Sequence, residues 1–453
     1  MIRLCRWIST AALLWFVVPV TAVDVAAQDA GAAPDSLGDF LRSMSDSTDA
    51  YFGASGAPVD TAGLDSSLAH RLAQPWLQDR RRLRLAPGPW LNFNRADGPL
   101  LGGTLGIGRE RGWGELQGRL ATVTGPNELR GGGRWRREWA SRDEDVPDWT
   151  LQVEAGRFTE RLDSDRRETA TYVMWVFLSG DDQQSYLRRD GTRIQLAREA
   201  SSWRAQLAFR TQLESPLTTT ATWSLFGPEL DLVENFPATP GRVQELTGTV
   251  ALRLPRFPVG VAVEERWSDA SLGSAFDYRR LRVNAGADLA LGQVVSLIPE
   301  LEYARLSGEV LPQNSFFMGG TRSLRSLEPN LNAGTGRTFA RLDAIFVPDL
   351  LALARLPHPA AFPIQGGVFT ATGAVWGRDV FGGAGSAENH WPDPDGWRSE
   401  AGVSLLYRPG IPDPSLFIRG DLAFPVGPGH ESRVLLYFHT ALDHVPLARR
   451  GSR

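Results

Sequence analysis

Apolar and polar residues alternate along most of the chain, from about Arg82 to Leu442, in segments of roughly ten residues separated by turns. Because successive side chains of a β-strand point to opposite faces, a period of two gives each strand one apolar and one polar face. The alternation is clear between Trp203 and Leu213, where Leu207 falls on one face and Arg210 on the other. The pattern therefore predicts a long series of two-faced β-strands.

Sixteen such segments can be counted, eleven before a long loop that contains Asn314–Pro329 and five after it. Residues 160–190 could hold a further element. The predicted strands occupy residues 84–94, 98–109, 113–123, 131–139, 149–158, 192–199, 202–213, 243–254, 258–267, 278–290, 294–307, 337–347, 364–376, 398–408, 415–425 and 433–442.

A soluble β-sandwich and a membrane β-barrel both use two-faced strands. A sandwich of this length would normally divide into domains, whereas a closed barrel satisfies every backbone hydrogen bond in lipid. We therefore predict an all-β fold, a transmembrane antiparallel β-barrel of about 16 strands. Alternating lipid-facing and lumen-facing residues explain the mean hydropathy of −0.21. Candidates for its interfacial aromatic girdles are Trp113, Trp135, Trp139, Trp149, Trp175, Trp203, Trp376 and Trp397.

The two ends of the chain are expected to lie outside the barrel. Residues 1–27, with a basic start and a short apolar run, predict a signal peptide, and residues 28–81 a flexible periplasmic segment. The barrel is expected at residues 82–443 and a short periplasmic tail at 444–453. An even number of strands places both termini on the periplasmic side of a cell outer membrane.

Composition and motifs argue against several functions. The net charge of −4 gives no indication of nucleic acid, and the single cysteine, Cys5, falls within the predicted signal peptide. Neither a G-x-S-x-G nor an H-E-x-x-H motif is present. A barrel hydrolase would need a serine close to a lumen-side histidine such as His439, which the linear sequence leaves open. We expect no catalytic, cofactor-binding or metal-binding residues, and no enzyme.

The loop between the eleventh and twelfth predicted strands has the most distinctive sequence, N-S-F-F-M-G-G-T-R-S-L-R-S-L-E-P at Asn314–Pro329. Gly319 and Gly320 allow a tight turn that a side chain would hinder. Arg322 and Arg325 follow with apolar residues near them. An ordinary surface loop with a glycine turn is the alternative reading of these residues.

This loop resembles the conserved loop of the BamA/TamA superfamily of outer-membrane assembly barrels, the bacterial surface antigen family. Ser326 and Leu327 stand where the family has a glycine and an aromatic residue. Residues 93–98 and the stretch from Gly402 to the last strand also resemble the family, here a member lacking recognisable periplasmic repeat domains. The matching loop residues are Phe316, Phe317, Gly319, Gly320, Ser323, Leu324 and Arg325, with Arg322 between them.

The resemblance implies that the long loop folds toward the barrel lumen, where its arginine pairs with an acidic residue. The family's acid lies in the pattern Phe-x-Asp-x-Gly, which here reads Phe369, Ala371 and Gly373, so the acid is lost. Asp343 and Asp421 are the candidate partners on predicted lumen faces. We expect Arg325 or Arg322 to pair with Asp343. The alternative is an extracellular loop, with these charges lining a wet lumen.

The function that the resemblance implies is insertion or translocation of outer-membrane proteins, or handling of lipid. A weak seam between the first and last strands would pair with a client strand by β-augmentation. The alternative is a non-catalytic pore or structural barrel plugged by its own loop. Expected partners are outer-membrane lipid and either client outer-membrane proteins or periplasmic factors, with no nucleic acid and no cofactor.

Overall fold

The computed structural model describes residues 84–440 apart from several short gaps, and the chain divides into units 1–79 and 80–453. The described part lies wholly in the second unit. The predicted signal peptide, periplasmic segment and tail lie outside it. The gaps are residues 110–113, 140–147, 163–175, 179, 181, 183, 201, 222, 227–234, 236, 255–258, 321–322, 328–331, 358–362, 379–390, 408–415 and 428–432.

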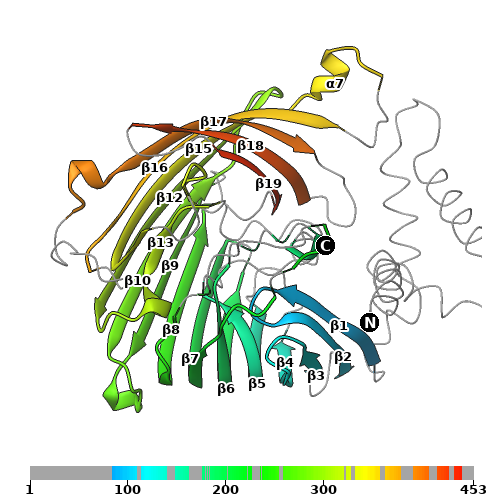
Figure 1. Cartoon of the computed structure of the whole chain (residues 1–453), viewed down its shortest axis with the longest axis vertical. Helices are drawn as coiled ribbons and strands as arrows, with labels where there is room; N and C mark the ends of the chain where they lie inside the picture. The colour runs from blue at the N-terminus through cyan, green and yellow to red at the C-terminus, as the bar shows by residue number, and fades with distance from the viewer. Residues whose placement is uncertain are drawn as a thin grey trace, which may run out of the picture. The chain divides into compact units, whose positions relative to one another are not determined.

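One antiparallel sheet dominates the structure, and each strand pairs with the next along the chain (Figure 1). Its segments are β1 (Arg84–Asn94), β2 (Gly98–Arg109), β3 (Gly114–Val123), β4 (Glu128–Trp139), β5 (Asp148–Arg161), β6 (Tyr186–Glu199), β7 (Trp203–Pro216), β8 (Gly241–Arg253), β9 (Val259–Ser268), β10 (Tyr278–Ala287), β11 (Leu289–Leu291), β12 (Val295–Gly308), β15 (Gly336–Phe346), β16 (Ile364–Trp376), β17 (Arg398–Tyr407), β18 (Leu416–Val426) and β19 (Arg433–Thr440).

The number of strands agrees with the sequence prediction. Seventeen segments form the sheet, but β10 and β11 pair with the same neighbour and are two parts of one strand, which leaves sixteen. The long loop lies between the eleventh and twelfth of them, β12 and β15. Over the described residues no pairing joins β1 to β19, so these strands form the two edges of the sheet. The predicted fold class, a β-barrel of about sixteen antiparallel strands, is confirmed.

Strand β6 begins at Tyr186, whereas the alternation predicted a start at residue 192. The missed residues include Arg188, Arg189 and Asp190, whose consecutive charges hide the alternation. Arg189 is buried and its Nε lies 2.9 Å from Glu214 Oε1, so an inward ion pair satisfies this charge. Between β5 and β6 the described residues contain no further strand.

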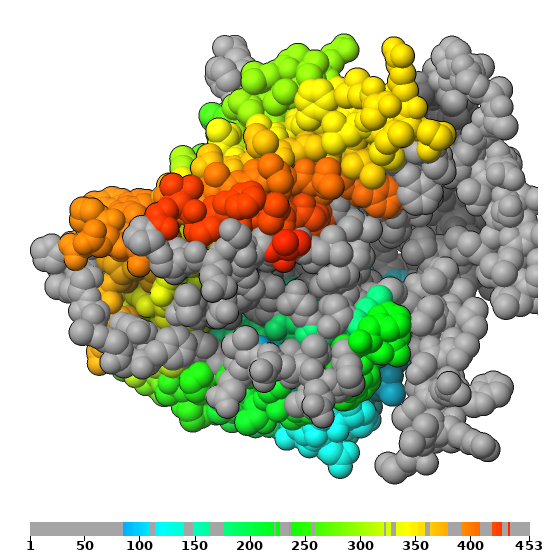
Figure 2. Space-filling view, turned by 45° about the horizontal axis from the view of Figure 1, so that its top comes forward, coloured from blue at the N-terminus to red at the C-terminus, as the bar shows by residue number. Residues whose placement is uncertain are grey.

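The two faces of the wall have opposite polarity, with the apolar side chains exposed and the charged ones buried. On β7, Leu207 and Leu213 are 53% and 49% exposed, whereas Arg210 and Glu214 are 7% and 1% exposed. A soluble sheet buries its apolar face instead. Exposed apolar residues around a charged interior are the pattern of a barrel wall in lipid. In the space-filling view β15 to β19, yellow through red, form a continuous band of this wall (Figure 2).

Small elements complete the connections between strands. Within the long loop, β13 (Phe316–Met318) and β14 (Asn332–Gly334) form a two-stranded sheet of their own. No helix in the described ranges is long and apolar enough to cross a membrane. The short helices are η1 (Ala270–Leu272), η2 (Pro312–Asn314), α7 (Leu350–Leu353) and η3 (Pro394–Gly396).

The orientation of the two faces gives a first prediction. Leu207→Arg should lower the free energy of unfolding from phospholipid vesicles by about 2–4 kcal/mol, because it places a charge in hydrocarbon. The inward control Thr249→Arg, which lies opposite Glu264 on β9, should cost about 1 kcal/mol or less. Urea titrations followed by tryptophan fluorescence measure both changes. Equal losses in the two variants would contradict the assignment of the faces.

Candidate functional site

The long loop turns back on itself at its glycine pair. Gly319 and Gly320 have φ angles of 117° and 79°, a region in which a side chain is strained. The Gly319 N–H donates to Ser323 Oγ at 2.6 Å, and that hydroxyl donates to the Gly319 carbonyl at 3.1 Å. The Gly320 N–H donates to the Leu327 carbonyl at 3.0 Å. These bonds hold Ser323–Leu327 as a compact turn, and all five of its residues are buried.

The Arg325 side chain joins this turn to the barrel wall. Its side chain is 0% exposed, and its Nε lies 3.0 Å from Asp421 Oδ2 on β18. Its Nη1 lies 3.6 Å from Asp343 Oδ1 on β15. The guanidinium carbon lies 4.2 Å from the centroid of the Phe369 ring on β16, a cation–π contact. The structure therefore brings together Arg325 and both candidate acids, with Asp421 nearer than the expected Asp343.

A second arginine balances the charge. Arg419 Nε donates to Asp421 Oδ1 at 2.9 Å, and Arg419 Nη2 donates to Asp343. Ser404 Oγ donates to Asp421 Oδ1 at 2.5 Å. Two arginines thus form ion pairs with two aspartates on the inner side of the wall, and all four side chains are almost fully buried. We call Arg325, Asp343, Arg419 and Asp421 the four-charge cluster.

The motif Phe369-x-Ala371-x-Gly373 on β16 packs against the loop through apolar contacts. Ala371 is buried and packs in one cluster with Met318, Leu324, Leu327 and Phe339. A Cβ added to Gly373 would lie 2.8 Å from the Met318 side chain and 2.9 Å from the Thr338 carbonyl, so the loop leaves no room there. Because the turn packs directly on Ala371, an aspartate at this position would place a carboxylate among these apolar side chains.

The carboxylate that meets the loop comes from the neighbouring strand. Glu400 on β17 is the direct cross-strand partner of Ala371 and is 0% exposed. Its Oε2 accepts a hydrogen bond of 2.6 Å from the Ser326 backbone N–H. On β15, Arg341 donates to the Ser323 carbonyl. Glu400 and Arg341 were not singled out as site residues from the sequence, because only the strand register shows which wall residues face the turn.

The first half of the loop is held by a second polar network. Gln313 Nε2 donates to Glu214 Oε2 at 3.2 Å, and Arg210 Nη2 lies 2.9 Å from Glu245 Oε2. Tyr278 Oη donates to the same Glu245 oxygen at 2.6 Å. The loop is therefore bonded to Glu214 on β7 as well as to the four-charge cluster, and Arg210 links Glu214 to Glu245 on β8.

Of the remaining predicted loop residues, Phe316 is buried and Phe317 is half-buried, both on β13. The Arg280 guanidinium carbon lies 4.5 Å from the Phe316 ring centroid. Arg322 lies outside the described residues. Among the residues that are described, no group of three or more His, Cys, Asp and Glu could hold a metal ion.

The turn after β1, which the sequence also singled out, is buried as well. Asn94 Oδ1 accepts hydrogen bonds from the N–H groups of Ala96 and Asp97 at 2.9 and 2.8 Å, and Asp97 forms an ion pair of 3.1 Å with Arg130. The Phe93 ring packs edge-on against Phe177, with ring centroids 5.4 Å apart. The turn between β1 and β2 is thus held by contacts with neighbouring segments.

The geometry defines a class of protein: a β-barrel of about sixteen antiparallel strands with its long loop folded into the interior. No protein-family model matches the sequence, and a comparison with curated proteins finds no match. Solved structures do match. One is BamA from Haemophilus ducreyi lacking POTRA domains 1–3, with 11% identity, a TM-score of 0.46, and coverage of 82% of this chain and 77% of that one.

Two further solved structures come from other bacteria. CdiB from Escherichia coli has 10% identity and a TM-score of 0.41, over 85% of this chain and 71% of that one. OccK11 (OpdR) from Pseudomonas aeruginosa has 13% identity and a TM-score of 0.28, over 79% of this chain and 93% of that one. At such identities no residue role is transferred from these proteins.

Loss of the loop arginine gives a second prediction. Arg325→Ala should lower the free energy of unfolding by about 3–5 kcal/mol, because it leaves an excess of buried negative charge. The loop should also become accessible. Ser326→Cys, 5% exposed at the native residue, should react slowly with a charged maleimide alone and at least about tenfold faster with Arg325→Ala.

The control for this experiment is Arg279→Ala, which removes an exposed arginine that pairs with Glu265. It should leave the labelling rate of the cysteine unchanged. Equal labelling with and without Arg325 would show that the four-charge cluster does not hold the loop.

A third prediction concerns an acidic residue introduced at position 371. Ala371→Asp should destabilise the barrel by at least about 2 kcal/mol, because it buries a second carboxylate beside Glu400. In the double variant Ala371→Asp/Glu400→Ala, the loss of unfolding free energy should be smaller than the sum of the two single losses by about 1 kcal/mol or more. Ala371→Asn, which adds no charge, should show a coupling below about 0.5 kcal/mol in the same cycle. Additive losses for the aspartate would contradict the proximity of the two carboxylates.

Proposed function

We propose that this barrel acts in the insertion or translocation of outer-membrane proteins, with lipid handling as a related activity. The observation that carries the proposal is the buried Arg325, held by Asp421 and Asp343 inside the wall. Burying a guanidinium is costly unless it is paired, so a loop sequence that brings it there points to a role inside the barrel. The resemblance of the same loop residues to the assembly barrels supports this role.

The edges of the sheet fit the mechanism. Pro87 and Pro89 lie in β1, and neither has a backbone N–H. The Gly88 carbonyl faces β2, where it accepts a hydrogen bond of 3.2 Å from Thr104 Oγ1. Because adjacent residues of a strand point their backbone groups to opposite sides, the two prolines face the free edge. That edge lacks two donors, which weakens closure against β19 and favours exchange with a client strand.

A plugged pore or structural barrel is the second candidate. Leu324 and Leu327 are 0% and 1% exposed, so the turn is packed as tightly as a protein core. A loop held in this way could serve only to close the lumen. A steady large conductance in planar bilayers on Arg325→Ala, with no effect on client insertion, would favour this candidate.

A fourth prediction tests the proposed function directly. A photo-crosslinking residue at Leu91 in β1 or Val434 in β19 should capture a radiolabelled, nascent eight-stranded outer-membrane barrel during its insertion. The same residue at Leu342 on β15, an exposed position away from both edges, is the control and should capture none. Capture at all three positions, or at none, would contradict client pairing at the edges.

A further inference from the structure

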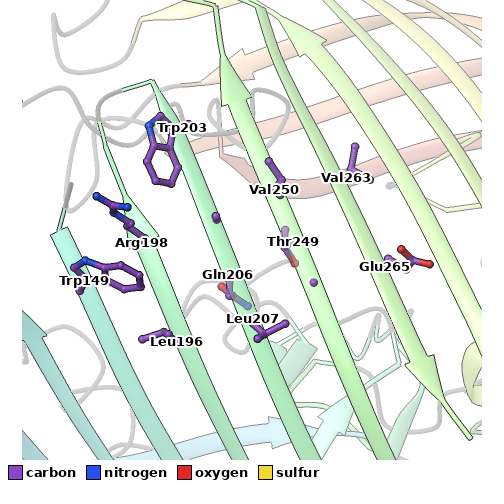
Figure 3. A pocket seen from close by; sticks show the side chains of 12 residues that line it. Trp149, Leu196, Arg198, Trp203, Gln206, Leu207, Thr249, Val250, Val263 and Glu265 are labelled. Atoms are coloured by element: carbon purple, nitrogen blue, oxygen red, sulfur yellow. The ribbon is translucent and has the colours of Figure 1, made fainter. Parts of the chain in front are cut away.

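The outward face of β5 to β9 has a groove of about 530 Å³ (Figure 3). Two small residues, Ala205 on β7 and Gly248 on β8, line it between larger apolar side chains. A Cβ added to Gly248 would meet no atom within 4 Å, so the space above this glycine is open. The flanking side chains that face the groove are Leu196, Leu207, Val250 and Val263, each at least 38% exposed.

Arg198 lies at one end of this groove, between two tryptophans. Its guanidinium carbon is 5.0 Å from the Trp149 ring centroid and 5.7 Å from that of Trp203, and Figure 3 shows it between the two rings. Arg198 is the cross-strand partner of the outward-facing Trp149 and of Ala205, so it belongs to the lipid-facing side of the wall. The rings fix the position of its charge.

The charge of Arg198 is not matched by the protein over the described residues. The other charged residue of the groove, Glu265, forms an ion pair with Arg279. Arg198 makes no ion pair with any described residue, and its Nε is buried without a hydrogen-bond partner there. A cation on a wall that faces lipid is costly unless an anion accompanies it.

The tryptophans indicate which anion is available. Trp139, Trp149 and Trp203 lie at the ends of β4, β5 and β7, all at the end of the wall where the strand connections are short. Aromatic girdles of this kind mark the membrane–water interface, the level at which lipid phosphates lie. The groove runs from Arg198 toward the middle of the wall, where acyl chains lie.

We propose that this groove binds one anionic phospholipid, with the headgroup phosphate on Arg198 and an acyl chain between Leu207 and Val250 over Gly248. The guanidinium offers two N–H groups to the phosphate oxygens, and the tryptophans flank the headgroup. The site is on the outside of the barrel. It does not depend on the proposed role in protein insertion, and either proposal can fail without the other.

The test uses the full chain purified in dodecyl maltoside and native mass spectrometry with added dioleoylphosphatidylglycerol. The wild-type protein should bind one lipid at least about tenfold more tightly than dioleoylglycerol, which lacks the phosphate. Arg198→Gln should remove this preference. Arg157→Gln is the matched control, an exposed arginine whose carboxylate partner Asp190 is 3.1 Å away, and it should bind as the wild type does.

A second variant separates lipid binding from folding. Gly248→Leu fills the groove without touching Arg198 and should weaken lipid binding by about tenfold while the barrel stays folded. The proposal is overturned if Arg198→Gln binds the lipid as tightly as the wild type. It is also overturned if the phosphate-free lipid binds equally well, or if millimolar inorganic phosphate displaces the lipid, which would indicate a site for free anions.

Discussion

Lipid on the outside of this wall excludes unpaired charge, and the rest of the structure depends on that constraint. The strands therefore turn Leu207 and its outward neighbours to hydrocarbon and gather Arg210, Glu214 and Glu245 inside. Inside the wall these charges have little water, so each needs a partner. The interior is consequently a set of paired networks, and the long loop is held by joining two of them.

The four-charge cluster forms without an acidic residue at the position on β16 where the sequence resemblance predicted one. Ala371 occupies the position on β16 where an acid was expected. It packs against Leu324 and Leu327 of the loop. The guanidinium of Arg325 is then carried to Asp421, where Arg419 keeps the charges equal. Glu400, opposite Ala371, binds the loop backbone instead of its arginine.

Alternation alone was enough to predict the sixteen strands and the loop after the eleventh, because lipid imposes a strict period of two. It failed at the start of β6, where Arg189 turns inward to Glu214 while the adjacent Arg188 pairs with Glu128 and Asp190. The alternation also placed Asp343 and Asp421 on the lumen-facing side of their strands. It could not identify Glu400, since the pairing of residue 400 with residue 371 is a matter of register between strands. A contact that depends both on the register between strands and on the path of the loop cannot be predicted from the pattern of one strand.

Spin labels along β7 test the central claim most directly. Nitroxides placed singly at positions 205 to 209 of the protein in phospholipid vesicles report collisions with lipid-soluble oxygen and with a water-soluble nickel chelate. Collision with oxygen should alternate with a period of two and be high at 205, 207 and 209. A position 207 that is shielded from oxygen, as it would be against a second sheet, would contradict the assignment of the apolar face to lipid.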